Sequence, residues 1–123
     1  YMTHWGYHLI LNGRNCIPAS IRSAKHIGIF TSTLVNQIDM VPYGKPQIVM
    51  FGTGNKKGFT LVQLIETSNI CAHFVEETDD MYLDVFSCKP FDEKVVKKVV
   101  DNFFSPATMD TKLILRDAST RMQ

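Results

Sequence analysis

The sequence lacks an excess of charge of either sign, and it lacks a long apolar run. Its 13 Lys and Arg residues balance 12 Asp and Glu residues, which leaves a formal net charge of +1. So weak a field attracts neither nucleic acid nor an anionic membrane, so we expect neither as a partner. No apolar stretch reaches the roughly 18 to 20 residues that span a bilayer, and residues 1–5 lack the pattern of a secretion signal. These absences predict a cytoplasmic protein whose partners are selected by a local site.

Cysteine is also scarce. The three cysteines are Cys16, Cys71 and Cys88, and none of them lies in a CxxC pair or near a histidine at zinc-ligand spacing. We therefore predict free thiols and no metal site. A chain of 123 residues should bury about two thirds of its unfolded surface, so it needs neither a disulfide nor a metal to fold. The absence of repeats, low-complexity tracts and linkers predicts a single domain over residues 1–123.

The hydrophobic pattern predicts an α+β fold. Apolar, β-favouring segments predict strands over residues 5–11, 47–51, 59–66, 69–75, 81–88 and 112–115. Apolar residues at three- and four-residue spacing predict one helix after an N-cap at Ser20 and another after an N-cap at Asp92. Two helices cannot cover both faces of such a sheet. We therefore expect a two-layer sandwich, an antiparallel sheet with both helices on one face, whose other face is covered by a second subunit.

The glycine- and lysine-rich segment 52–58 has two interpretations. Glycines and lysines together suggest a phosphate-binding loop, but such a loop precedes a helix, and segment 52–58 leads into the apolar strand that begins at Phe59. We therefore favour a hairpin loop between two strands.

Five residues with reactive or ionisable side chains fall within a short part of the chain: Ser68, His73, Glu77, Asp84 and Cys88. A serine or cysteine nucleophile with a histidine base and an orienting carboxylate is one interpretation. The residue types alone equally allow a half-buried histidine, a small core cysteine and a turn serine.

The spacing of these residues resembles that of the small prokaryotic-type S-adenosylmethionine decarboxylases. In that family, Glu-Ser-His is followed by Ile-x-Ile-His-Thr-Trp-Pro-Glu and then by Asp-x-Phe-Thr-Cys. Residues 67–77 and 83–88 follow this pattern without a gap from Ser68 to Cys88. The family's Gly-x-Ser matches Gly58-Phe59-Thr60, and its Gly-x-His-Leu matches Gly6-Tyr7-His8-Leu9.

The resemblance implies a cofactor that the protein makes from its own chain. The Ser68 hydroxyl attacks the carbonyl of Thr67, and the chain is then cut between them, which leaves a pyruvoyl group on the new N-terminus. Such a reaction needs strain at this peptide and hydrogen-bond donors for the oxyanion. The resemblance implies a part in the proton transfers for His73, with Thr60 where the family has serine.

The resemblance also implies the substrate and a homodimer. The pyruvoyl carbonyl forms a Schiff base with S-adenosylmethionine and accepts the electrons released with carbon dioxide. Cys88 then returns a proton to the substrate carbon, and Glu77 accepts the ribose hydroxyls. The product is the aminopropyl donor for spermidine synthesis. Candidate aromatic contacts for the sulfonium are Tyr7, Phe51, Phe59 and Phe86.

The chain departs from the family pattern around the cleavage site. Thr67 replaces glutamate, Asn69 replaces histidine, and Val75-Glu76 replaces Trp-Pro. Two alternatives therefore stay open. One is a pyruvoyl-dependent decarboxylase of ornithine or arginine, and the other is a nucleoside-binding homologue that does not cleave itself.

Overall fold

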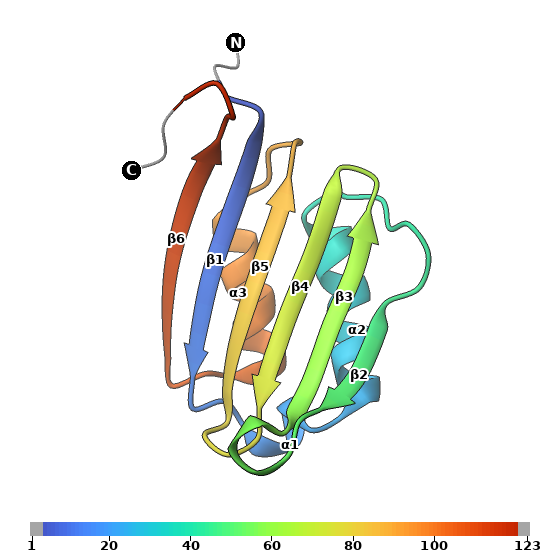
Figure 1. Ribbon diagram of the computed structural model, residues 1–123, viewed down its shortest axis with the longest axis vertical. Coiled ribbons are helices and arrows are strands. Elements are labelled where there is room, and N and C mark those ends of the chain that lie inside the picture. Colours follow the sequence, from blue (N-terminus) through green and yellow to red (C-terminus); the bar gives the residue numbers. More distant parts are fainter. Residues whose placement is uncertain (1–3, 121–123) are drawn as a thin grey trace.

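The computed structural model describes residues 4–120, which form two layers (Figure 1). Within these residues, one layer is a six-stranded sheet and the other consists of three helices on one of its faces. The strands are β1 Gly6–Arg14, β2 Gln47–Phe51, β3 Gly58–Ile65, β4 Ser68–Val75, β5 Asp80–Ser87 and β6 Thr108–Arg116. The helices are α1 Pro18–Ile21, α2 Ala24–Gln37 and α3 Glu93–Phe104, and a 3₁₀ turn, η1, spans Gly54–Lys56. The predicted α+β sandwich is confirmed.

The strand order is β2-β3-β4-β5-β1-β6, and every neighbouring pair is antiparallel. The first strand thus lies between β5 and β6. This order brings three distant segments together at one end of the sheet. Ser68 at the start of β4 lies opposite Ser87 at the end of β5, and Ser87 lies opposite Tyr7 at the start of β1.

The core lies between the sheet and the helices. Alternate residues of the central strands point toward the helices, and Leu9, Ile70 and Val85 have no exposed surface. They meet the apolar stripes of α2 and α3, where Phe30 and Phe104 are also fully buried, with ring centroids 4.7 Å apart. Each such side chain stabilises the fold by roughly 1.5 to 3 kcal/mol through burial.

Four details of the predicted elements are wrong. The first strand does not end at Leu11 but continues through Asn12 and Gly13 to Arg14, because β5 and β6 pair with it there. The N-cap of α2 is Ser23, whose side chain accepts a hydrogen bond from the His26 N–H, whereas Ser20 lies inside the separate short helix α1. Pro18 at the first turn of α1 favours this extra helix, because proline there loses no hydrogen bond. The last strand spans nine residues rather than four, because β1 supplies backbone hydrogen bonds along its whole length. The predicted cap at Asp92 is confirmed, since its carboxylate accepts from the Lys94 N–H.

The glycine-rich segment is a hairpin connection, as predicted. It joins β2 to β3, which pair in antiparallel register from Phe51 opposite Gly58 onwards. Gly58 is needed there, because a Cβ atom at this position would lie 1.6 Å from the Phe74 carbonyl oxygen. The Gly-x-Thr motif therefore reflects a close approach of two backbones.

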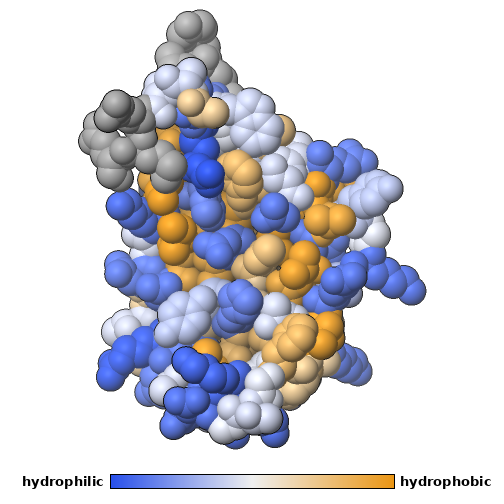
Figure 2. Space-filling view, viewed as in Figure 1, coloured by the Kyte–Doolittle hydropathy of each residue, from blue (hydrophilic) through white to orange (hydrophobic). Residues whose placement is uncertain are grey.

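The opposite face of the sheet carries no helix (Figure 1). Figure 2 shows this face as apolar patches among polar side chains. The cross-strand row Val49, Thr60, His73 and Tyr82 lies on it, and Val49 and Tyr82 are both exposed. Exposed apolar side chains on one sheet face are typical of an interface. Among the helices that the structure describes, none is long and apolar enough to cross a membrane.

Candidate active site

The predicted cleavage site lies in the tight turn between β3 and β4. Ile65 and Ser68 pair with each other, so only Glu66 and Thr67 form the turn. Ser68 is half-buried, and its φ angle is 159°. That value is close to extended backbone, so the strain expected from the sequence is not found in the φ angle of Ser68.

A hydrogen-bond donor already faces the carbonyl of Thr67. The backbone N–H of Cys88 donates to the Thr67 carbonyl oxygen across 3.1 Å. Cys88 directly follows β5, and the pairing of β5 with β4 places it beside the turn. Within residues 4–120, the Ser68 hydroxyl makes no hydrogen bond of its own. The site thus combines a polarised carbonyl with an adjacent hydroxyl that is free to rotate.

The side chain of Thr67 is held by a small buried network. The Ser87 hydroxyl donates to the Thr67 hydroxyl oxygen across 2.7 Å, and the Thr67 hydroxyl donates to the Met40 sulfur across 3.3 Å. The backbone N–H of Lys89 donates to the Ser87 oxygen across 2.9 Å. The side chain and the backbone carbonyl of Thr67 are thereby both connected to residues 87–89, at the end of β5.

Thr60 and His73 form a second polar pair on the uncovered face. They lie opposite each other on β3 and β4, and the Thr60 Oγ1 to His73 Nδ1 distance is 3.2 Å. His73 is exposed and lies five residues along β4 from Ser68, about 17 Å at roughly 3.4 Å per residue. A single chain therefore brings Thr60 to His73 but brings neither to Ser68.

The remaining predicted residues are spread over both ends of the sheet. Glu77 is exposed in the turn after β4, at the end opposite Ser68. Tyr7 lies at the Ser68 end, and Phe59 packs against the core. Asp84 contacts His8, not His73, with 3.4 Å between its Oδ1 and the Nε2 of His8.

His8 lies in a relay of polar side chains on the uncovered face, between Arg116 and Asp84. Nη1 of Arg116 lies 3.1 Å from Nδ1 of His8. Because a guanidinium only donates, Nδ1 is the acceptor in this contact, which leaves Nε2 as the ring nitrogen that faces Asp84. The relay connects the last strand to the middle of the sheet.

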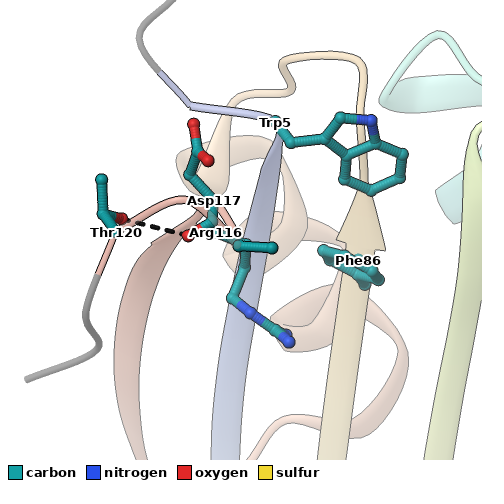
Figure 3. A pocket seen from close by; sticks show the side chains of 6 residues that line it. Trp5, Phe86, Arg116, Asp117 and Thr120 are labelled. Atoms are coloured by element: carbon teal, nitrogen blue, oxygen red, sulfur yellow. Dashed lines mark hydrogen bonds between the residues drawn. The ribbon is translucent and has the colours of Figure 1, made fainter.

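A cavity of about 650 Å³ opens beside this relay (Figure 3). Its lining comes from Trp5, Phe86, Arg116, Asp117, Ala118 and Thr120. The rings of Trp5 and Phe86 are 5.7 Å apart, and the Arg116 guanidinium lies 5.0 Å from the Phe86 ring centroid. Phe86 pairs with Asn69, the residue after Ser68, so the cavity and the cleavage turn lie at the same end of the sheet.

The cavity also carries a negative group. Hydrogen bonds from the Ser119 side chain and then from its backbone N–H lower the pKa of Asp117. The cavity thus combines two aromatic rings with one cationic and one anionic side chain, Arg116 and Asp117, a lining that suits a flat ligand with polar groups. Of the cavity residues, only Phe86 was a candidate from the sequence. Trp5 is the only tryptophan and directly precedes the Gly6 motif, a signal that could have identified it.

The three cysteines are free thiols, as predicted, but their surroundings differ. Burial, with added repulsion from Asp80 and Asp79, raises the pKa of Cys16 to about 11. Burial and then Asp84 raise the pKa of Cys71. Cys88 is the thiol next to the cleavage turn. Within residues 4–120, no three His, Cys, Asp or Glu side chains are grouped so as to hold a metal ion.

Comparisons with known proteins identify the family and the fold. The S-adenosylmethionine decarboxylase family model matches residues 7–117. The crystal structure of the adenosylmethionine decarboxylase from Aquifex aeolicus superposes with a TM-score of 0.81 at 17% identity, covering 99% of this chain and 98% of that one. This likeness confirms the fold. No curated protein sequence matches the chain. Because the family match extends over most of its length, the chain belongs to the S-adenosylmethionine decarboxylase family.

Proposed function

We propose that this protein is a pyruvoyl-dependent S-adenosylmethionine decarboxylase that cuts itself between Thr67 and Ser68. Its product is the aminopropyl donor for spermidine synthesis. Membership of the family supports S-adenosylmethionine decarboxylation in general. The observation that carries the proposal for this chain is the Cys88 N–H at 3.1 Å from the Thr67 carbonyl, next to the unbonded hydroxyl of Ser68.

The cleavage begins as a shift of the Thr67 acyl group from nitrogen to oxygen. The Ser68 Oγ bonds to the Thr67 carbonyl carbon, and the Cys88 N–H stabilises the oxyanion. The peptide C–N bond then breaks, and the Ser68 nitrogen takes up the hydroxyl proton. The product is an ester between Thr67 and Ser68.

Elimination and hydrolysis complete the cut. Loss of the Ser68 α-proton breaks the Cβ–Oγ bond and releases Thr67 as a carboxylate. The dehydroalanine left at residue 68 rearranges to an imine, and water replaces its nitrogen, which leaves as ammonia. One water is consumed and one ammonia is released, so no external oxidant is needed. The pyruvoyl group then provides a carbonyl electron sink for the loss of carbon dioxide.

A homodimer explains how His73 and Thr60 reach the cleavage site. They lie on the uncovered face, about 17 Å of strand from Ser68. In a twofold dimer formed by this face, with the axis perpendicular to the strands, the strands of the two copies run in opposite directions, so that one end of a sheet meets the opposite end of its partner. We therefore infer that each active site contains Ser68 and Cys88 of one protomer together with Thr60 and His73 of the other.

The same dimer unites the proposed substrate contacts. The cavity with Trp5 and Phe86 lies at the Ser68 end, and Glu77 lies at the opposite end of the chain's own sheet. In the proposed dimer, Glu77 comes from the partner protomer. The aromatic rings and Asp117 then bind the cationic sulfonium and the adenine, and Glu77 accepts the ribose hydroxyls.

Replacing Cys88 should separate cleavage from turnover. Cys88→Ala keeps the backbone N–H that holds the Thr67 carbonyl, so the chain should still be cut at close to the wild-type rate. Turnover should fall at least about a hundredfold, because the thiol is the proposed proton donor to the substrate carbon. Intact mass and carbon dioxide release measure the two steps. Cys16→Ala, at the other end of the sheet, should change neither, and loss of cleavage in Cys88→Ala would contradict this assignment.

Replacing Glu77 should affect S-adenosylmethionine selectively. Glu77→Gln should lower kcat/KM for S-adenosylmethionine, because a charged acceptor for the ribose is lost. The loss should correspond to roughly 1 to 3 kcal/mol of transition-state stabilisation. Any activity on ornithine or arginine should stay unchanged, since these substrates have no ribose. Steady-state carbon dioxide release from the three substrates measures both effects, and quenching of Trp5 fluorescence reports whether substrate reaches the cavity.

The matched control is Glu76→Gln in the same turn. Within residues 4–120, the Glu76 carboxylate forms one ion pair, with Lys57 at 3.9 Å, and Glu76→Gln should leave kcat/KM unchanged. An equal loss in both variants would show a general effect of the turn. Higher activity on ornithine or arginine than on S-adenosylmethionine would overturn the proposed substrate but leave the cleavage mechanism in place.

A further inference from the structure

We propose that Ser87 is a positioning residue for the self-cleavage, because its hydroxyl clamps the side chain of Thr67 and so holds the scissile carbonyl against the Cys88 N–H. The inference rests on the proposed self-cleavage and extends it to residues with no other assigned role. Ser87 has no exposed surface and lies directly opposite Ser68 in the sheet.

The hydrogen bonds around Ser87 form a chain in which each group donates to the next, from the Lys89 N–H to the Met40 sulfur. The Lys89 N–H donates to Ser87 Oγ, and Ser87 Oγ donates to Thr67 Oγ1 at 2.7 Å. The Thr67 hydroxyl uses its own proton toward the Met40 sulfur, at 3.3 Å. Ser87 Oγ also lies 3.7 Å from the Met40 sulfur. Because a hydroxyl has one proton to donate and the Thr67 oxygen is the nearer and stronger acceptor, the Ser87 proton is directed to Thr67. Thr67 is thereby held from two sides.

The far end of this chain of hydrogen bonds is anchored as well. Met40 follows α2 and is only 7% exposed, and the preceding Asp39 accepts from the Lys89 ammonium through Oδ2 at 3.2 Å. On the other side of Thr67, the Glu66 N–H donates to the Val41 carbonyl at 2.9 Å. The segment 39–41 therefore contacts the turn through Met40 and Val41, and Ser87 contacts Thr67 from β5.

A threonine at position 67 suits this clamp for a chemical reason. The clamp needs a group that accepts from Ser87 and donates to Met40. A hydroxyl does both, whereas an ionised carboxylate only accepts. With Thr67 held, only the Ser68 hydroxyl must rotate into line with the carbonyl, and restricting the other groups to this geometry favours the attack.

The test compares cleavage rates by intact mass. Ser87→Ala should slow the cut at least about tenfold, because the carbonyl is no longer held in the attack geometry. Ser87→Thr keeps the hydroxyl and should restore the rate. Hydroxylamine, which cuts an ester but not an amide, should release no fragment from uncut Ser87→Ala, because the defect precedes the ester. Ser20→Ala is the matched control, since its buried hydroxyl binds the Ile17 carbonyl far from the turn.

A second variant removes the same contact from its other side. Thr67→Val is nearly isosteric and should slow cleavage to a similar extent, and combining it with Ser87→Ala should add little, because both changes break one interaction. Fully additive effects, or a wild-type rate in either single variant, would overturn the inference.

A third measurement does not depend on cleavage at all. In a Ser68→Ala background, which cannot form the ester, hydrogen exchange of the Cys88 amide reports how firmly its bond to Thr67 is held. Ser87→Ala should raise that exchange rate about tenfold or more. An unchanged rate refutes the clamp even if the chain cleaves. If the wild-type chain stays uncut but Ser87→Ala still raises the exchange rate of the Cys88 amide, the proposed cleavage is refuted and the clamp is supported.

Discussion

Ser68→Ala should leave the chain at its full 14.0 kDa and remove all decarboxylase activity. The wild-type chain should instead yield a fragment of residues 1–67 and one of residues 68–123, whose N-terminus is blocked as pyruvoyl. Alanine has no hydroxyl to attack the Thr67 carbonyl, so neither the cut nor the cofactor can form. Intact mass spectrometry and carbon dioxide release from S-adenosylmethionine measure both losses.

The control for this prediction is Ser32→Ala, an exposed serine on α2 that should cleave as the wild type does. A wild-type chain that stays intact after long incubation, indistinguishable from Ser68→Ala, would refute self-cleavage. The non-processing nucleoside-binding homologue would then be the better description.

Co-expression of Ser68→Ala with His73→Ala chains should restore activity that neither variant has alone. In a mixed dimer, the Ser68 of one protomer meets the His73 of the other, so one of the two sites is complete. Random pairing makes half of the dimers mixed, so about a quarter of the wild-type activity should return. The physical reason is the separation of His73 from Ser68 by five residues along β4. Differently tagged chains, purified through both tags, allow activity and cleavage to be measured on mixed dimers alone.

A chain with both substitutions provides the control. Mixed dimers of this double variant with the wild type should be inactive, because each site lacks one of the two groups. Sites built within one protomer would give the opposite pair of results, with no restoration in the first experiment and activity in the second. A monomer of 14.0 kDa by light scattering would contradict the dimer itself.

The elements with a strong local pattern could be predicted from the sequence. Alternation along residues 82–88 and the helical spacing of Ile27, Phe30 and Leu34 are properties of neighbouring residues, and the structure confirms both. Element boundaries were less predictable. Ser20 and Ser23 are both good N-cap residues, and only the separate turn that begins at Pro18 decides between them.

Motif spacing likewise identified the turn at Thr67 and Ser68 and the cysteine after β5, because β4 and β5 are adjacent along the chain and pair directly. The spacing could not show that His73 is too far from Ser68 to act on it within one chain. That separation follows from the extended geometry of β4, which carries five residues over about 17 Å.

The sequence by itself determined the fold class, the family pattern and the peptide proposed to be cut, since each depends on residues close together in the chain. Only the tertiary structure decided what surrounds that peptide. Trp5 and Arg116 form one cavity because β1 and β6 pair across more than 100 residues. Met40 reaches Thr67 because α2 packs on the sheet and ends beside the turn. Contacts of this kind depend on how strands and helices are ordered in space, which local periodicity does not specify.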